Sequence, residues 1–269
     1  MADPTPGRAH LITGGFPPGS MGGHDHDYAR LKLLALLAER GVPASVANDF
    51  ADIGKWLPTS QLLITYVAGP YPDAAQTEAI RDWLEAGGHW LALHGTSGGR
   101  AQRVEGARMR RTVKTEHHAL LGCMFLTHPP IREFRVEVSA APSPLTKGLG
   151  TSFTVEDEPY FIELQEPAST QILLTAEFGP TAAGATEHLY PSDTSLLPDG
   201  KSRVLGYSRD VGRGGVVYFA FGHCHNPAIR AARAIADPAD KTPPTFRAPW
   251  ETTAVVTLLR NAIAWGVGA

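Results

Sequence analysis

The fold is decided by residues 62–95, LLITYVAGPYPDAAQTEAIRDWLEAGGHWLALHG. This stretch begins with an apolar run over residues 62–67, of the kind found in strands that are buried on both faces. Apolar residues then recur at helical spacing over 75–84, and the pattern ends at Gly87. A second apolar run covers residues 90–94. Strand, helix and strand joined by short loops predict neighbouring parallel strands in a doubly wound sheet.

The same alternation precedes this stretch. Residues 10–13 are an apolar run followed by a glycine-rich loop over 14–23. A helical pattern over residues 31–38 ends at Gly41, and a short strand is predicted at 43–47. The first hundred residues therefore predict an α/β domain.

The second half of the chain has a different pattern. Three segments alternate apolar and polar side chains, which is typical of half-exposed antiparallel strands: residues 131–138, 170–175 and 203–207. A continuous apolar strand is predicted at 216–221 and a helix at 255–263. Together these patterns predict one α/β domain over residues 1–269, with additional antiparallel strands beside a mostly parallel central sheet.

Composition excludes several classes of function. The 269 residues include 24 Lys and Arg against 27 Asp and Glu, so no basic excess indicates nucleic-acid binding. Cys123 and Cys224 lie too far apart for a cysteine zinc motif or a disulfide scaffold. No apolar stretch approaches the roughly 20 residues that cross a membrane, and the N-terminus lacks a signal-peptide pattern. We expect a cytoplasmic protein.

Histidine and tyrosine side chains follow four predicted strands. Ligands of doubly wound sheets bind beyond the carboxyl ends of the strands. The residues expected there are His24 and His26 after the first strand, Tyr66, His94, and His223 with His225 after the late core strand. We expect these side chains to gather at one edge of the sheet, although buried or solvated structural histidines would give the same pattern.

Two H-x-H pairs indicate a metal site. In extended chain, alternate side chains point the same way, so His24 with His26 and His223 with His225 could each present two imidazoles to one ion. The predicted cofactor is a divalent metal, zinc or manganese, and a metallohydrolase is one reading of these pairs.

The sequence does not match the common motifs for nucleotide binding or for a catalytic nucleophile. The glycines at 14, 15 and 19 do not form G-x-G-x-x-G, and no G-K-[ST] is present. The strand ending at Leu93 runs into His94-Gly95-Thr96-Ser97-Gly98, which contains neither a cysteine nor a G-x-S-x-G elbow. A serine or cysteine nucleophile is therefore not expected.

Several short motifs, taken in order, resemble those of the ThuA-like family, named for trehalose utilisation. They are Gly23-His24, Ala79-Ile80-x-x-Trp83-Leu84-x-x-Gly87-Gly88, Leu93-His94, Leu121-Gly122-x-x-Phe125-x-x-His128-Pro129, Ser143-Pro144-Leu145-Thr146-x-Gly148-Leu149, Asp157-Glu158-Pro159-Tyr160, Gly212-Arg213-Gly214-Gly215-Val216-Val217-Tyr218 and Phe221-Gly222-His223. The chain departs from the family pattern at Ser143, where a histidine is common, and at Tyr207, where a tryptophan is usual.

This resemblance implies a flavodoxin-like, class I glutamine amidotransferase-like three-layer sandwich and a role in sugar metabolism. Family members occur with oxidoreductases that make 3-keto-sugars, so a sugar oxidoreductase is an expected pathway partner and a small carbohydrate the expected ligand. A homo-oligomer is also compatible, and residues 234–250 would form a lid or a subunit contact.

The leading hypothesis is a sugar-processing enzyme that uses acid–base chemistry. His94, Glu158, His223 and Asp157 are the candidate catalytic residues, with Glu158 favoured over Asp157 because adjacent side chains in extended chain point opposite ways. The residues expected to orient the substrate are His24, Tyr66, His128 and Tyr160. The alternatives are a non-catalytic carbohydrate-binding or regulatory domain and the metallohydrolase.

Overall fold

The computed structural model describes residues 7–15, 23–106, 110–180, 189–229 and 243–268. A nine-stranded sheet at its centre has the order β2-β1-β3-β4-β13-β12-β11-β8-β9. The first five strands in this order are parallel and form what we call the parallel half: β2 (Ala44–Ala47), β1 (Ala9–Gly15), β3 (Leu62–Ala68), β4 (His89–Leu93) and β13 (Gly214–Phe219). The other four pair antiparallel and form the antiparallel half: β12 (Ser202–Val211), β11 (Thr170–Glu177), β8 (Arg132–Val138) and β9 (Ser152–Asp157).

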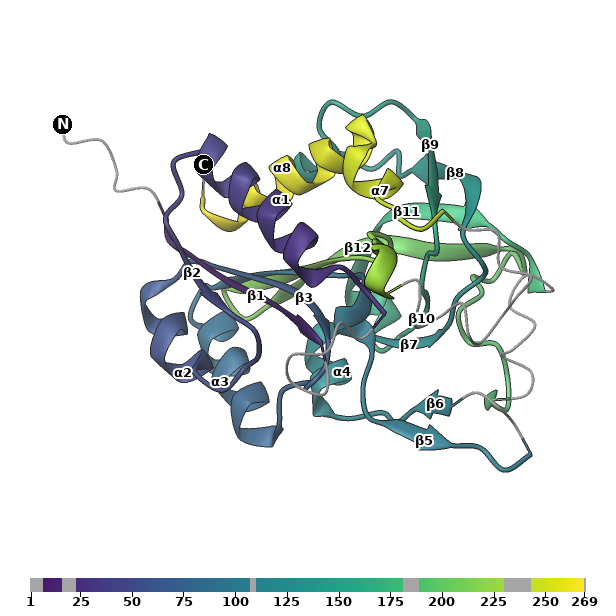
Figure 1. Ribbon diagram of the computed structural model, residues 1–269, viewed down its shortest axis with the longest axis horizontal. Coiled ribbons are helices and arrows are strands. Elements are labelled where there is room, and N and C mark those ends of the chain that lie inside the picture. The colour runs from purple at the N-terminus through teal and green to yellow at the C-terminus, as the bar shows by residue number, and fades with distance from the viewer. Residues whose placement is uncertain (1–6, 16–22, 107–109, 181–188, 230–242, 269) are drawn as a thin grey trace.

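Helices cover both faces of the parallel half (Figure 1). One face carries α1 (His26–Glu39) and α8 (Thr253–Gly266). The other carries α2 (Ile53–Trp56), α3 (Ala74–Glu85) and α4 (Glu116–Leu121). The short helix α7 (Ala248–Glu251) precedes α8. The predicted three-layer α/β architecture is therefore confirmed.

Local sequence explains the central strand–helix–strand unit. The side chains of β3 up to Val67 are buried, as its apolar run predicted. Helix α3 begins with a capping box in which the Asp73 carboxylate accepts from the Gln76 backbone N–H at 2.8 Å. It ends before Gly87, whose φ of 111° suits glycine.

Smaller elements complete the chain. Two separate antiparallel pairs are β7 (Cys123–Thr127) with β10 (Phe161–Leu164) and β5 (Ala101–Arg103) with β6 (Arg110–Thr112). Single 3-10 turns occur at η1 (Leu57–Thr59), η2 (His94–Ser97), η3 (Pro144–Thr146) and η4 (Pro167–Ser169). The buried apolar side chains of both halves belong to one hydrophobic cluster that includes Trp90, Leu174 and Val217.

The structure adds detail that sequence patterns did not predict. Strand β9 and the β7–β10 pair were not expected, and Asp157 is the last residue of β9 rather than part of a loop. Parts of two segments named in the sequence analysis lie outside the described residues: 16–22 of the glycine-rich loop, and 234–242 of the expected lid or subunit contact.

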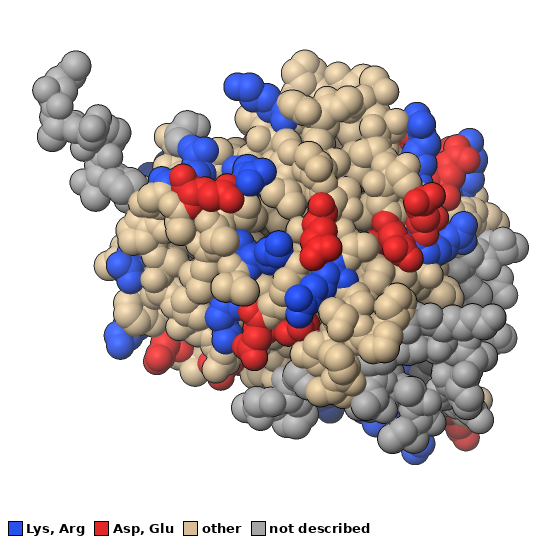
Figure 2. Space-filling model, turned by 45° about the horizontal axis from the view of Figure 1, so that its top comes forward, with Lys and Arg blue, Asp and Glu red and all other residues tan. Residues whose placement is uncertain are grey.

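The charged side chains on the surface agree with the near-neutral net charge. On the face drawn in Figure 2, Lys and Arg side chains are interspersed with Asp and Glu side chains. Within the described ranges, no helix combines the length and the apolar character needed to cross a membrane.

Candidate active site

Three histidines meet where strands of the parallel half end. His94 directly follows β4, His223 lies four residues after β13, and His24 lies two residues before α1 in the segment that follows β1. All three side chains are buried, and each offers one nitrogen within 4.8 Å of the other two. We call these residues the histidine cluster. These three side chains therefore gather at the carboxyl edge of the sheet, as the sequence led us to expect.

His94 occupies a constrained backbone position. Its φ of 42° is the one positive value at a non-glycine residue among the described residues. Such a conformation costs on the order of 1–3 kcal/mol and is common at functional sites. The Nδ1 atom lies 3.0 Å from the carbonyl oxygen of Ala220. Because a carbonyl can only accept, Nδ1 carries the hydrogen, and the lone pair of the neutral ring is on Nε2.

His223 is oriented through His225. The Nε2 atom of His225 donates to the Pro243 carbonyl oxygen at 2.8 Å, so its Nδ1 accepts when the ring is neutral. His223 Nε2 lies 3.0 Å from this Nδ1 and is therefore the donor. In the neutral state the lone pair of His223 is on Nδ1, which is the atom that faces Glu158.

Glu158 lies between two histidines. Its Oε1 is 3.4 Å from His223 Nδ1, and its Oε2 is 3.4 Å from His128 Nδ1. The Glu158 side chain is buried, whereas about 30% of the His128 side chain is exposed. A buried carboxylate between two imidazoles, one of them open to solvent, is an arrangement suited to proton transfer.

Asp157 binds the backbone. Its carboxylate accepts from the N–H groups of Glu158 at 2.7 Å, Gly222 at 2.6 Å and His223 at 3.1 Å. Complete burial raises the pKa of Asp157 to about 8, while these three N–H groups act in the opposite direction. Asp157 thus joins the end of β9 to the segment that carries His223, and Glu158 is the carboxylate that reaches the cluster.

Tyr160 forms one wall of the site. Its ring lies against His94, with centroids 3.8 Å apart, and against Phe125, with centroids 4.2 Å apart. Its hydroxyl is 3.3 Å from His24 Nε2. An aromatic face next to polar hydrogen-bonding groups is the kind of surface on which a sugar ring packs.

Tyr66 and His26 lie beside the cluster. The Tyr66 hydroxyl donates to the Gly222 carbonyl oxygen at 2.8 Å, and burial holds its pKa well above the usual value. His26 is the first residue of α1, and its ring centroid is 5.6 Å from that of Tyr66. Burial lowers the pKa of His26 to about 4. The group of close ligand nitrogens includes neither His26 nor His225, so the two H-x-H pairs each contribute one member.

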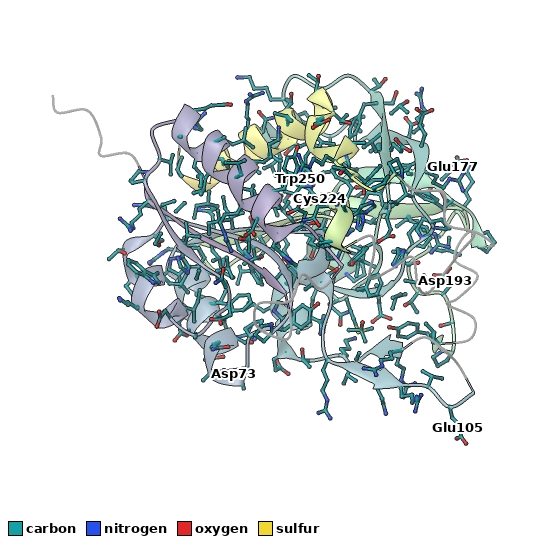
Figure 3. The ribbon with its side chains drawn as sticks, viewed as in Figure 1. Asp73, Glu105, Glu177, Asp193, Cys224 and Trp250 are labelled. Carbon is teal, nitrogen blue, oxygen red and sulfur yellow. The ribbon has the colours of Figure 1, made fainter. Side chains whose placement is uncertain are left out.

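Two residues near the site, Trp250 and Cys224, were not predicted from the sequence to lie there. Trp250, labelled in Figure 3, donates from Nε1 to the Gly222 carbonyl oxygen at 2.8 Å. The thiol of Cys224 contacts the Asp25 carbonyl oxygen at 3.4 Å, and burial raises its pKa to about 12. A thiol that stays protonated at neutral pH is a poor nucleophile.

Comparison with solved structures shows the same fold. A ThuA-like protein from Bacteroides uniformis has 18% sequence identity and a TM-score of 0.60 over 98% of this chain and 92% of its own. A ThuA-like protein from Parabacteroides merdae has 16% identity and a TM-score of 0.61 over 98% of this chain and 91% of its own. A cold-adapted β-galactosidase from Rahnella sp. R3 has 14% identity and a TM-score of 0.53 over 81% of this chain and 29% of its own.

No curated protein matches the chain. The family model described as ThuA, trehalose utilisation, matches residues 19–232. This range includes the histidine cluster, Glu158 and Tyr160, and it covers most of the chain. The chain therefore belongs to the ThuA family.

Proposed function

We propose that this chain is an enzyme of carbohydrate metabolism that acts on a keto-sugar by acid–base chemistry. The observation that carries the proposal is the position of Glu158, buried and 3.4 Å from both His223 and His128 at the carboxyl edge of the sheet. The family description, trehalose utilisation, supports a sugar as the substrate class.

The proposed first step is proton removal next to the keto group. The Glu158 carboxylate takes a proton from the carbon beside the carbonyl. The electron pair of that C–H bond forms a C=C bond, and the π pair of the carbonyl moves to the keto oxygen. That oxygen receives a proton from an imidazolium, for which His128 is placed 3.4 Å from Glu158 Oε2 and is accessible to solvent. The resulting enediol is the common start of isomerisation and of elimination of a glycosidic oxygen.

The aromatic wall would orient the sugar. Tyr160 packs between His94 and Phe125, and its hydroxyl reaches toward His24. An oxidoreductase that makes the keto-sugar would supply the substrate.

Exchange of the α-proton in D₂O tests the proposal. A 3-keto-glucoside incubated with the protein should lose its α-proton signal in the NMR spectrum, and Glu158→Gln should slow this loss by about 10²-fold or more. Glu156→Gln is the matched control, because Glu156 is an exposed residue of β9 two positions away. We expect it to exchange at the wild-type rate.

The same samples separate an enzyme from a binding domain. If wild type binds keto-glucosides in a titration but never exchanges their α-protons, the site is non-catalytic. Equal exchange rates for wild type and Glu158→Gln would exclude Glu158 as the base.

A further inference from the structure

We propose that His24, His94 and His223 bind one divalent metal ion, and that His225 positions His223 as a ligand. The three residues form the one group of at least three metal-ligating side chains with close ligand atoms among the described residues. They come from segments that are far apart in the sequence, and all three side chains are buried. Neutral imidazoles that converge from different strand ends are the donor set preferred by zinc and similar ions.

The spacing of the nitrogens is close to that of a bound ion. Zinc–nitrogen bonds are about 2.0–2.1 Å long, so two nitrogen ligands of a tetrahedral ion lie roughly 3.3 Å apart. The cluster nitrogens lie within 4.8 Å of one another, so the widest pair must close by at most about 1.5 Å. Small side-chain rotations supply such a movement without a change of the backbone.

Hydrogen bonds outside the cluster hold two rings in the tautomer that a ligand needs. A metal-ligating histidine usually donates its other ring N–H to a carbonyl or carboxylate. His94 does so to the Ala220 carbonyl at 3.0 Å. His223 does so through His225, which in turn donates to the Pro243 carbonyl at 2.8 Å. Each ring therefore keeps a lone pair on the nitrogen opposite its donor.

His225 and His26, the other members of the H-x-H pairs, are not ligands in this proposal. His225 has one ring nitrogen on His223 and the other on the Pro243 carbonyl, so it is a positioning residue. His26 starts helix α1, and the regular alternation that would align it with His24 ends there. This differs from a site made of both H-x-H pairs, because His94 replaces His26 and His225.

Glu158 lies close enough to the cluster to interact with a bound ion. A carboxylate oxygen 3.4 Å from His223 Nδ1 is near enough to bind the ion or a water on it. When bound, a divalent ion would polarise a carbonyl oxygen placed beside it. That chemical use rests on the proposed keto-sugar activity, whereas metal binding itself does not.

Metal content measures the proposal directly. Untagged protein is stripped with chelator, incubated with Zn²⁺ or Mn²⁺, gel-filtered and analysed by elemental mass spectrometry. We expect about one zinc or manganese per chain in wild type and a loss of roughly tenfold or more in His24→Gln, His94→Asn and His223→Gln. Asparagine is chosen at position 94 because it tolerates a positive φ.

Two further variants distinguish ligands from neighbours. His225→Gln should weaken zinc affinity by about 10–100-fold, the usual effect of a residue that orients a ligand. His26→Gln is the matched control, a buried histidine beside the cluster, and should retain the wild-type metal content. Circular dichroism and the melting temperature of each metal-free variant verify that it folds.

Two results would overturn the metal site: wild-type protein that retains neither ion, and a His26→Gln variant that loses metal as fully as His94→Asn. Full α-proton exchange by metal-free protein would overturn the ion's chemical use in the keto-sugar reaction. Bound zinc together with absent proton exchange would instead support the metal site and contradict the proposed function.

Discussion

The two halves of the sheet contribute to the site in different ways. The parallel half places His94 and His223 after the carboxyl ends of its strands, where its topology brings such ends together. The antiparallel half reaches the same point through hydrogen bonds after and at the end of β9, in which Asp157 binds the backbone of Gly222 and His223. The sheet topology thus brings His94 and His223 together, whereas Glu158, the residue after Asp157, is held near them by a few hydrogen bonds of Asp157.

One carbonyl shows how closely the halves are joined. The Ala220 carbonyl oxygen accepts from His94 Nδ1 at 3.0 Å and from the Tyr160 backbone N–H at 2.9 Å. His94 belongs to the parallel half and Tyr160 follows the antiparallel strand β9. A substitution that displaces His94 should therefore also displace Tyr160, and the reverse.

The largest effect expected is a loss of stability in acid, and it arises on the parallel side. Burial lowers the pKa of His10 in β1 and of His26 in α1 to about 4, and that of His117 in α4 to about 3. The unfolded chain binds these protons near pH 6.5, so between pH 6.5 and 4 it holds more protons than the folded chain. The free energy of unfolding should fall as the pH is lowered through this range.

Urea unfolding at pH 7, 6 and 5 measures this slope. Each histidine contributes up to about 1.4 kcal/mol per pH unit, and Asp157, with its raised pKa, contributes with the opposite sign. His117→Gln should reduce the slope by about one histidine's share. A stability that is constant between pH 7 and 5 would contradict the burial of these rings as neutral groups.

The next effect tests the connection from the antiparallel side. Asp157→Ala leaves the N–H groups of Gly222 and His223 without their acceptor in a buried place, which should lower the free energy of unfolding by about 4 kcal/mol. Glu156→Ala, an exposed change on the same strand, should cost less than about 0.5 kcal/mol. Similar losses in the two variants would show that Asp157 does not join the halves.

The sequence predicted the parallel half well because its signals are local. The strands β1, β4 and β13 contain apolar runs, and a residue that follows such a run lies at the carboxyl edge by topology alone. His24, His94 and His223 were found in this way. Strand β9 was missed because its sequence SFTVED has few buried positions at the edge of the sheet.

Which histidines meet in the cluster could not be predicted from spacing. The H-x-H pairs suggested four ligands on the assumption of extended chain, but α1 begins at His26 and the chain beyond β13 is no longer a strand. Whether His225 faces an ion or another imidazole depends on Pro243, eighteen residues further along the chain. Such a contact is fixed by tertiary packing and leaves no periodic signal.

The smallest effect expected is at the Gly222 carbonyl, which is the shared acceptor of a strand of the parallel half and of helix α7, which packs against β9. Tyr66 in β3 and Trp250 in α7 each donate to it at 2.8 Å. Tyr66→Phe should cost only about 1 kcal/mol of unfolding free energy, because Trp250 still satisfies the carbonyl. Adding Trp250→Phe leaves this buried oxygen without either donor, so the double variant should lose more than the sum of the two single changes. Strict additivity in urea unfolding would mean that the two donors stabilise the turn before His223 independently, and that the halves are less tightly coupled here than at Asp157.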